Sequence, residues 1–226
     1  MIDVRFADEA VPAERLDGTA LLVVDVQPDF LPGGALAVPD GDAILAPLAE
    51  LLTRFPFGLA VATQDWHPLG HVSFASAHAG KRPFEVTEVH GHPQTLWPDH
   101  CVQGTPGAAL HEGLSWERIS AVIRKGAQAD VDSYSGFQNN WDARGRRPPT
   151  GLAGYLRERG VEELYVCGLA RDFCVKWSAE DAAAAGFRTT VLWDLTRPVV
   201  AESDAQVRAD LVAAGVRIAD GSSVRR

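Results

Sequence analysis

Five side chains that could carry out chemistry lie at or just beyond the ends of apolar segments. In chain order they are Asp25, Asp65, His67, Lys125 and Cys174. Each comes from a different segment, except that Asp65 and His67 share one. A cysteine thiol can act as a nucleophile, a carboxylate can take its proton, and a lysine can stabilise the charges that form. The residue types therefore indicate covalent catalysis by Cys174, with Asp25 and Lys125 as its partners.

The local sequence around Cys174 supports this interpretation. In CGLARDFCVKWSAEDAA, an apolar strand ends near Leu169 and Asp172 can begin a helix, which would place Cys174 in the first helical turn. There, the helix dipole and free N–H groups would favour the thiolate and could hold the oxygen of a tetrahedral intermediate. Of the other two cysteines, Cys167 is expected to be a small buried hydrophobe, and Cys101 is expected to be structural.

The histidines near Asp65 have the spacing of a metal site. Asp65 and His67 are two residues apart, so on an extended segment both side chains point the same way. His71 follows four residues later, and His100 comes from WPDHC. One aspartate with two or three histidines suits Zn, Mn or Fe, whereas the alternative is a polar loop with solvated histidines. The remaining histidines lack this spacing and are expected on the surface: His78, His90, His92 and His111.

The elements that must position these residues alternate between strands and helices. Strands buried on both faces are predicted from apolar runs at 20–26, 58–63, 119–123, 163–169, 189–193 and 215–219. Helices are predicted at 41–54, 150–159, 171–185 and 201–214. The alternation indicates an α/β fold, with a mainly parallel sheet covered on both faces, as one domain over 1–226. Residues 1–18 form an unassigned N-terminal extension.

Such a sheet explains why the reactive side chains should meet. The carboxyl ends of parallel strands share one edge, and open α/β sheets bind ligands outside it. Taken singly, Asp25 could be a turn residue and Lys125 a solvated lysine, but their common position favours catalysis. The segment 66–118 breaks the alternation and is rich in Gly, Pro and His. A structureless loop of that length is usually functional.

Composition excludes several classes of function. The 226 residues carry a net charge of −9, which disfavours nucleic acid as a partner. No apolar run approaches the ~20 residues of a membrane span, and the charged N-terminus lacks a signal peptide. With three cysteines, an odd number, a disulfide framework is not expected, so we expect a cytoplasmic protein. Motifs for a serine nucleophile elbow, a phosphate loop or a dinucleotide fold are absent from the sequence. The oligomeric state stays open, a homo-oligomer included.

Several long blocks resemble one known family, in order along the chain. They are VVDVQPDFLPGGALAV, TQDWHPLGHVSFA, LWPDHCVQGTPGA, RKGAQADVDSYSGF and CGLARDFCVKWSAEDA. Together they are similar to the nicotinamidase (pyrazinamidase) family of the isochorismatase-like cysteine hydrolases, over about residues 20–220. The resemblance implies a six-stranded parallel sheet with helices on both faces. It also implies hydrolysis of nicotinamide, a small aromatic amide, to nicotinate and ammonia.

The resemblance also implies roles for individual residues. Asp25, Lys125 and Cys174 match the family's catalytic triad. One divalent metal, preferably Zn with Mn or Fe as alternatives, would be held by Asp65, His67 and His100, with His71 bound directly or through water. The Leu169–Ala170 peptide matches a cis bond that turns the Ala170 N–H toward the oxyanion, beside that of Cys174. The substrate pocket is implied to consist of Phe30, Trp97, Tyr134, Leu169 and Phe173.

One departure and two alternatives accompany this resemblance. Phe173 occupies a position where relatives carry Tyr or His, so a polar group beside the ring is missing and the fine substrate preference stays open. The nearest alternative is another hydrolase of the same superfamily, an N-carbamoyl amidase or isochorismatase. Asp65, His67 and His100 argue against it, because those enzymes usually lack this set. The other alternative is a non-catalytic metal or small-molecule binder, against which the complete triad argues.

Overall fold

A six-stranded parallel sheet forms the centre of the protein. The computed structural model describes residues 17–54 and 57–221. The strand order is β5-β2-β1-β6-β7-β8, and every neighbouring pair is parallel. The strands are β1 (Thr19–Val24), β2 (Leu59–Asp65), β5 (Ala121–Lys125), β6 (Glu163–Leu169), β7 (Arg188–Arg197) and β8 (Arg217–Ala219). All six lie at the predicted apolar runs, and the predicted parallel sheet is confirmed.

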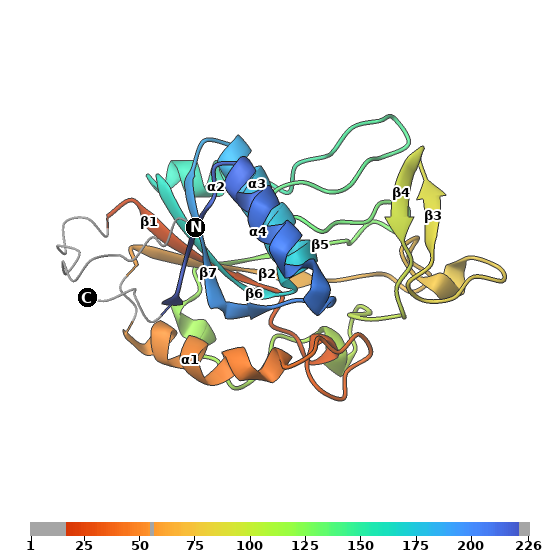
Figure 1. Cartoon of the computed structure of the whole chain (residues 1–226), viewed down its shortest axis with the longest axis horizontal. Helices are drawn as coiled ribbons and strands as arrows, with labels where there is room; N and C mark the ends of the chain where they lie inside the picture. The colour runs from red at the N-terminus through yellow and green to blue at the C-terminus, as the bar shows by residue number, and fades with distance from the viewer. Residues whose placement is uncertain (1–16, 55–56, 222–226) are drawn as a thin grey trace.

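Helices cover both faces of this sheet, as Figure 1 shows. On one face lies α1 (Leu45–Arg54), and on the other lie α2 (Leu152–Glu158), α3 (Lys176–Ala184) and α4 (Asp204–Ala213). Strand β1 separates two apolar cores because its successive side chains point to opposite faces. Leu21 belongs to the same core cluster as Leu48 of α1, whereas Leu22 belongs to the same core cluster as Leu211 of α4. The result is the three-layer fold expected from the sequence.

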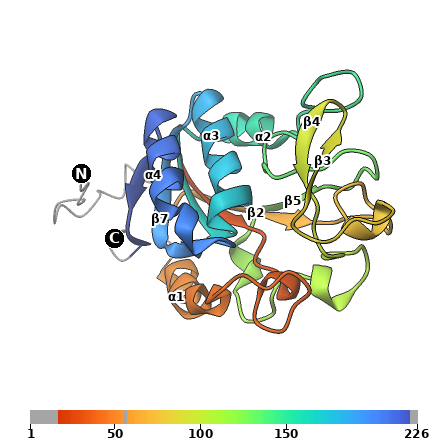
Figure 2. The same ribbon diagram turned by 45° about the vertical axis from the view of Figure 1, so that its right-hand side comes forward.

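Short turns complete the connections between these elements. They are 3₁₀ helices at Pro28–Phe30, Gly41–Ile44, Ala75–Ala77, Pro106–Ala108, Trp116–Arg118 and Ala201–Ser203, and a π-helix at Arg171–Val175. The π-helix leads directly into α3, so the predicted helix 171–185 begins with a wider turn than expected. Figure 2 shows α3 and α4 side by side over the sheet. Within the described ranges, none of the helices has the length and apolar character to cross a membrane.

The segment 66–118 is more ordered than its composition predicts. It contains an antiparallel hairpin of β3 (Val86–Val89) and β4 (His92–Thr95), set apart from the main sheet. These strands are short and partly exposed, so they lack the continuous apolar pattern that reveals a buried strand. The predicted N-terminal extension lies outside the described residues, except for Asp17 and Gly18.

Strands β1 and β6 approach each other closely at their carboxyl ends, directly before Asp25. Gly168 pairs with Val24 and has a φ of +113°, a region that L side chains rarely adopt. A Cβ placed on Gly168 would lie 2.1 Å from the Val24 carbonyl oxygen. The sheet at this point therefore requires glycine.

Gly168→Ala should destabilise the protein by about 3 kcal/mol, because the added methyl group forces two core strands apart. For a chain of this size we expect the melting temperature to fall by roughly 6–12 °C. Gly154→Ala is the matched control, since a Cβ there meets nothing within 4 Å. Its melting temperature should stay unchanged or rise slightly, because alanine favours a helix interior. Equal melting temperatures for both variants would contradict this account of β1 and β6.

Candidate active site and metal site

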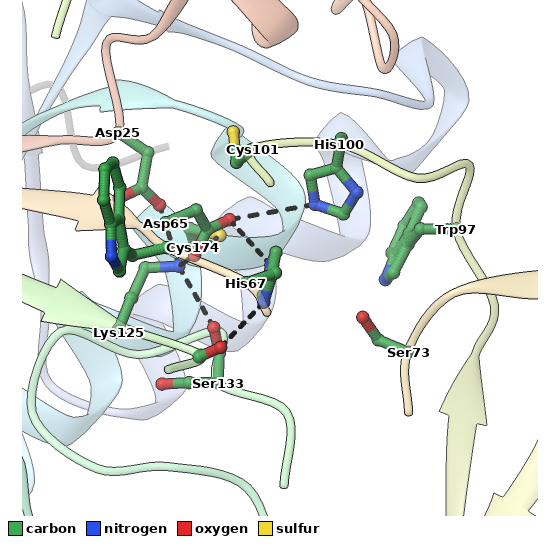
Figure 3. A network of polar contacts seen from close by, with 12 residues as sticks. Asp25, Asp65, His67, Ser73, Trp97, His100, Cys101, Lys125, Ser133 and Cys174 are labelled. Atoms are coloured by element: carbon green, nitrogen blue, oxygen red, sulfur yellow. Dashed lines mark hydrogen bonds and ion pairs between the residues drawn. The ribbon is translucent and has the colours of Figure 1, made fainter. Parts of the chain in front are cut away.

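The reactive side chains named from the sequence meet at the carboxyl edge of the sheet, as Figure 3 shows. Asp25 directly follows β1, and Asp65 and Lys125 end β2 and β5. Cys174 lies in the π-helix that follows β6. All four side chains are buried. Four elements separated in the sequence thus bring a thiol, two carboxylates and an ammonium group into one enclosed cluster.

Lys125 connects the members of this cluster. Its Nζ lies 2.9 Å from Asp25 Oδ2 and 3.3 Å from Cys174 Sγ, and it also forms an ion pair with Asp65. It donates a further hydrogen bond of 3.0 Å to the carbonyl oxygen of Ser133. Burial alone would lower the pKa of Lys125, but the two carboxylates raise it well above its usual value. The lysine is therefore a permanent positive charge inside the site.

Asp25 is held in place through both its backbone and its side chain. Its backbone is left-handed, with a φ of 47°, and its N–H donates to Thr63 Oγ1 at 3.2 Å. The Thr63 hydroxyl donates in turn to Asp25 Oδ1 at 2.7 Å. Oδ2 accepts no hydrogen bond within the described part of the chain, although Lys125 lies beside it. Burial raises the pKa of Asp25 to about 6, with a further increase from Asp65 that Lys125 and Thr63 oppose.

The protonation of Cys174 differs from the sequence-based expectation. A helix start was expected to favour the thiolate, but burial raises the pKa of Cys174 well above its usual value. The charges of Asp25 and Asp65 raise it further, and Lys125 only partly opposes them. The resting group is therefore a thiol. A thiol must lose its proton before its sulfur can act as a nucleophile, and the nearby Asp25 carboxylate, whose Oδ2 lies 2.9 Å from Lys125 Nζ, is a candidate acceptor.

The π-helix around Cys174 shapes the backbone beside the sulfur. The Ala170 carbonyl accepts hydrogen bonds from Phe173 N–H at 3.2 Å and from Val175 N–H at 3.0 Å, on either side of Cys174. The Leu169–Ala170 peptide bond is cis. Short π-helical turns are rare and occur frequently at functional sites.

Asp65, His67 and His100 form a group that fits a divalent metal. Asp65 Oδ2 lies 3.7 Å from His67 Nε2 and 3.9 Å from His100 Nε2. These separations are too long for hydrogen bonds, and ligands about 2.0–2.2 Å from one ion lie about 3–4 Å apart. The carbonyls of Gly126 and Pro98 bind the two Nδ1 atoms at 3.0 and 2.8 Å, which directs both Nε2 atoms inward. The donor chemistry and the orientation both fit a metal ion.

His71 lies beside this group rather than within it. Its ring centroid is 4.2 Å from that of His67, and its Nδ1 lies 2.8 Å from Ser73 Oγ. His71 shares a second possible ligand group with His67 and Asp132. Burial and the neighbouring His67 lower the pKa of both His71 and His100 to about 4. Both imidazoles are therefore neutral near pH 7, which is the form that binds a metal.

A mostly apolar pocket opens between the cysteine and the metal group. Its walls are Phe30, Leu36, Asp65, His67, Trp97, His100, Asp132, Ser133, Tyr134, Ala170, Phe173, Cys174 and Val199. Phe173 packs edge-to-face on Trp97, with ring centroids 4.8 Å apart, and lies 5.5 Å from Tyr134. Leu169, which the resemblance placed in the pocket, packs in the core on the α1 side instead, and Ala170 lines the pocket. Four aromatic side chains, those of Phe30, Trp97, Tyr134 and Phe173, thus lie in its walls.

Several supporting residues were not found from the sequence. Gln27 donates to the Asp65 carbonyl and accepts from the Asp65 N–H, at 2.9 and 2.8 Å, so it fixes the backbone of that carboxylate. Thr63 bonds Asp25 and the Ser133 carbonyl bonds Lys125, as described above. Thr63 could have been identified from the sequence, because it is a polar residue inside an apolar run that predicts a buried strand. The Ser133 contact was not predictable, because a backbone carbonyl carries no sequence signature. The four histidines that were expected on the surface are partly exposed there: His78, His90, His92 and His111.

Comparisons with known proteins agree with this site. The isochorismatase domain matches residues 19–221. A nicotinamidase of Acinetobacter baylyi is 46% identical over 186 residues, covering 82% of this chain and 84% of that protein. The solved structure of a nicotinamidase/pyrazinamidase from Acinetobacter baumanii is 43% identical, with a TM-score of 0.86, and covers 92% of this chain and 98% of that one.

A third comparison bears on the metal group. A pyrazinamidase of Pyrococcus horikoshii, solved in complex with zinc, is 35% identical with a TM-score of 0.72, covering 90% of this chain and 99% of that one. Together with the ligand group on this chain, this supports a divalent metal. The resemblance found in the sequence blocks is confirmed: the chain belongs to the isochorismatase domain family and, within it, to the group of the nicotinamidases.

Proposed function

We propose that this protein hydrolyses nicotinamide, and also pyrazinamide, to the carboxylate and ammonia through a thioester on Cys174. One observation carries the proposal. The Lys125 ammonium joins the Asp25 carboxylate and the Cys174 thiol in a buried cluster at the wall of an aromatic pocket. Relatives named nicotinamidase support the choice of amide. The three cysteines are buried free thiols, which supports a cytoplasmic setting.

The first half of the reaction transfers the acyl group to sulfur. Asp25 takes the thiol proton while Lys125 stabilises the resulting charges, and the sulfur adds to the amide carbon. The N–H groups of Ala170 and Cys174 hold the oxyanion of the tetrahedral intermediate. Asp25 then gives the proton to the amide nitrogen, the carbon–nitrogen bond breaks and ammonia leaves. The acyl group remains as a thioester on Cys174.

The second half restores the enzyme. Asp25 takes a proton from a water molecule, whose oxygen adds to the thioester carbon. The carbon–sulfur bond breaks, the acid leaves, and the proton returns to Cys174. Throughout, Lys125 keeps its charge because its pKa lies far above neutrality.

The walls of the pocket orient the aromatic ring of the substrate. Phe30, Trp97, Tyr134 and Phe173 surround the space beside Cys174. We propose that Asp65, His67 and His100 hold one divalent metal, preferably zinc, with His71 as a direct or water-mediated fourth partner. When bound, the metal would engage the ring nitrogen and fix the orientation of the ring. The chemical attack is left to the cysteine.

Cys174→Ala should abolish ammonia release from nicotinamide, by more than about 10³-fold, because no other group can form the thioester. Metal content, measured by emission spectroscopy, should stay unchanged. Cys167→Ala is the matched control, because the Cys167 thiol is buried in β6 and does not line the pocket. The Cys167→Ala variant should keep wild-type activity. If Cys174→Ala kept a tenth of the wild-type turnover, Cys174 would be excluded as the nucleophile. If the wild-type protein hydrolysed an N-carbamoyl substrate but not nicotinamide, that result would favour an N-carbamoyl amidase instead.

Activity should fall on the acid side of about pH 6. Asp25 must be ionised to accept the thiol proton, and burial places its pKa at about 6. Below that value the ionised fraction drops about tenfold per pH unit, and kcat/KM should follow it. Initial rates from pH 4.5 to 8, with a melting curve at each pH as a folding control, test this. A flat profile across the range would argue against Asp25 as the base.

His100→Ala should remove metal from the purified protein and raise KM more than it lowers kcat. The physical reason is that the metal orients the ring but takes no part in the covalent steps. Loss of one ligand should weaken binding of nicotinate by at least about tenfold, measured by calorimetry. The control is His111→Ala, because within residues 17–54 and 57–221 the His111 side chain accepts one hydrogen bond, from the Gly113 N–H. Unchanged nicotinate affinity in metal-free protein would contradict the orienting role.

A further inference from the structure

The outer wall of the pocket comes from a segment that contributes no reactive group. Val199 lines the pocket and is only half-buried, whereas most lining residues are fully buried. It follows the end of β7 and precedes the 3₁₀ turn Ala201–Ser203. Its position therefore depends on whatever fixes this connection to the rest of the site.

The Asp172 carboxylate bonds the backbone of this connection, while the Val199 side chain packs against the core on the α1 side. Asp172 Oδ1 accepts the Val199 N–H and Asp172 Oδ2 accepts the Val200 N–H, each at 2.9 Å. The Ser203 hydroxyl adds a longer contact of 3.4 Å to Oδ2. Asp172 lies two residues before Cys174, next to Phe173, which also lines the pocket. It thus joins the outer wall to the turn that carries the nucleophile.

The nucleophile turn has other, stronger anchors. Arg171 is buried and donates to Thr196 Oγ1, to the Thr196 carbonyl and to Asp204 Oδ2, at 2.8, 2.7 and 2.6 Å. Val175 N–H is bonded to the Ala170 carbonyl. These contacts hold the turn in place without Asp172. Removing the Asp172 carboxylate should therefore release the Val199 wall and leave Cys174 where it is.

We infer that Asp172 is a positioning residue for the substrate ring, which acts by holding Val199 against the open side of the pocket. The inference rests on the proposed amide hydrolysis. Without the carboxylate, the two backbone N–H groups would bond water instead, and the wall would withdraw from the ring. The ring would lose apolar contact, but the sulfur, its base and the lysine would keep their geometry.

Kinetics of Asp172→Asn on nicotinamide test the inference. The amide of asparagine has one acceptor oxygen, and its NH₂ group would face the second N–H. We expect KM to rise about tenfold, while kcat stays within about twofold of wild type. Val199→Ala should raise KM by a similar factor, because it removes the wall itself. In the double variant the effects should not multiply, since both changes act through the same contact.

The matched control is Asp142→Asn. Asp142 also holds two backbone N–H groups with its carboxylate, those of Arg144 and Arg146, but it does not line the pocket. This variant should keep wild-type KM and kcat. Melting curves for every variant show that the protein is folded. A tenfold loss of kcat in Asp172→Asn at unchanged KM would overturn the inference, and so would a rise in KM of about 100-fold in the double variant.

Hydrogen exchange followed by mass spectrometry provides a readout that needs no activity. The peptide covering residues 197–203 should exchange faster in Asp172→Asn than in wild type, and the same peptide in Asp142→Asn should not. Unchanged exchange in Asp172→Asn would show that the carboxylate does not hold the wall. If the wild-type protein failed to release ammonia from nicotinamide, that result would count against the proposed function alone. The hydrogen-exchange comparison would still decide whether Asp172 holds Val199 in place.

Discussion

The buried ammonium group of Lys125 is the interaction on which the site depends. A lysine removed from water is stable as a cation only where opposite charges compensate it, and here Asp25 and Asp65 do so from two other strand ends. The strand order places β5 beside β2, with β1 next and β6 beyond. The side chain of Lys125 therefore contacts Asp65 on the neighbouring strand and also extends to Asp25 and to the sulfur of Cys174. Each partner requires the others, because a single carboxylate or thiol left alone in this interior would be an uncompensated polar group.

Asp65 links the two halves of the site. One of its oxygens forms the ion pair with Lys125, and the other faces the Nε2 atoms of His67 and His100. Burial alone would raise the pKa of Asp65, but Lys125 and the histidines hold it well below its usual value. The carboxylate is thus negative at any ordinary pH. Its charge serves the metal group and, at the same time, raises the pKa values of Asp25 and Cys174.

Much of this arrangement could be predicted from particular sequence features. The apolar run before Asp25 and those before Asp65 and Lys125 identify parallel strands, and parallel strands bring their ends to one edge. The hairpin of β3 and β4 was missed because its residues are polar and half-exposed, without a buried period. The Asp172 contacts with Val199 and Val200 also escaped prediction, since backbone N–H groups are present at nearly every residue and only the fold selects which ones meet a carboxylate.

The sequence by itself determined which groups are available and on which edge of the sheet they lie. Residue types and strand ends are local properties, so Cys174, Asp25, Lys125 and the Asp65–His67 pair could be named without coordinates. Only the tertiary structure decided their charge states. A helix start predicts a thiolate at Cys174, but full burial beside two carboxylates keeps the proton on sulfur. Desolvation and the electrostatic field depend on atoms that are distant in the chain, and no local pattern records them.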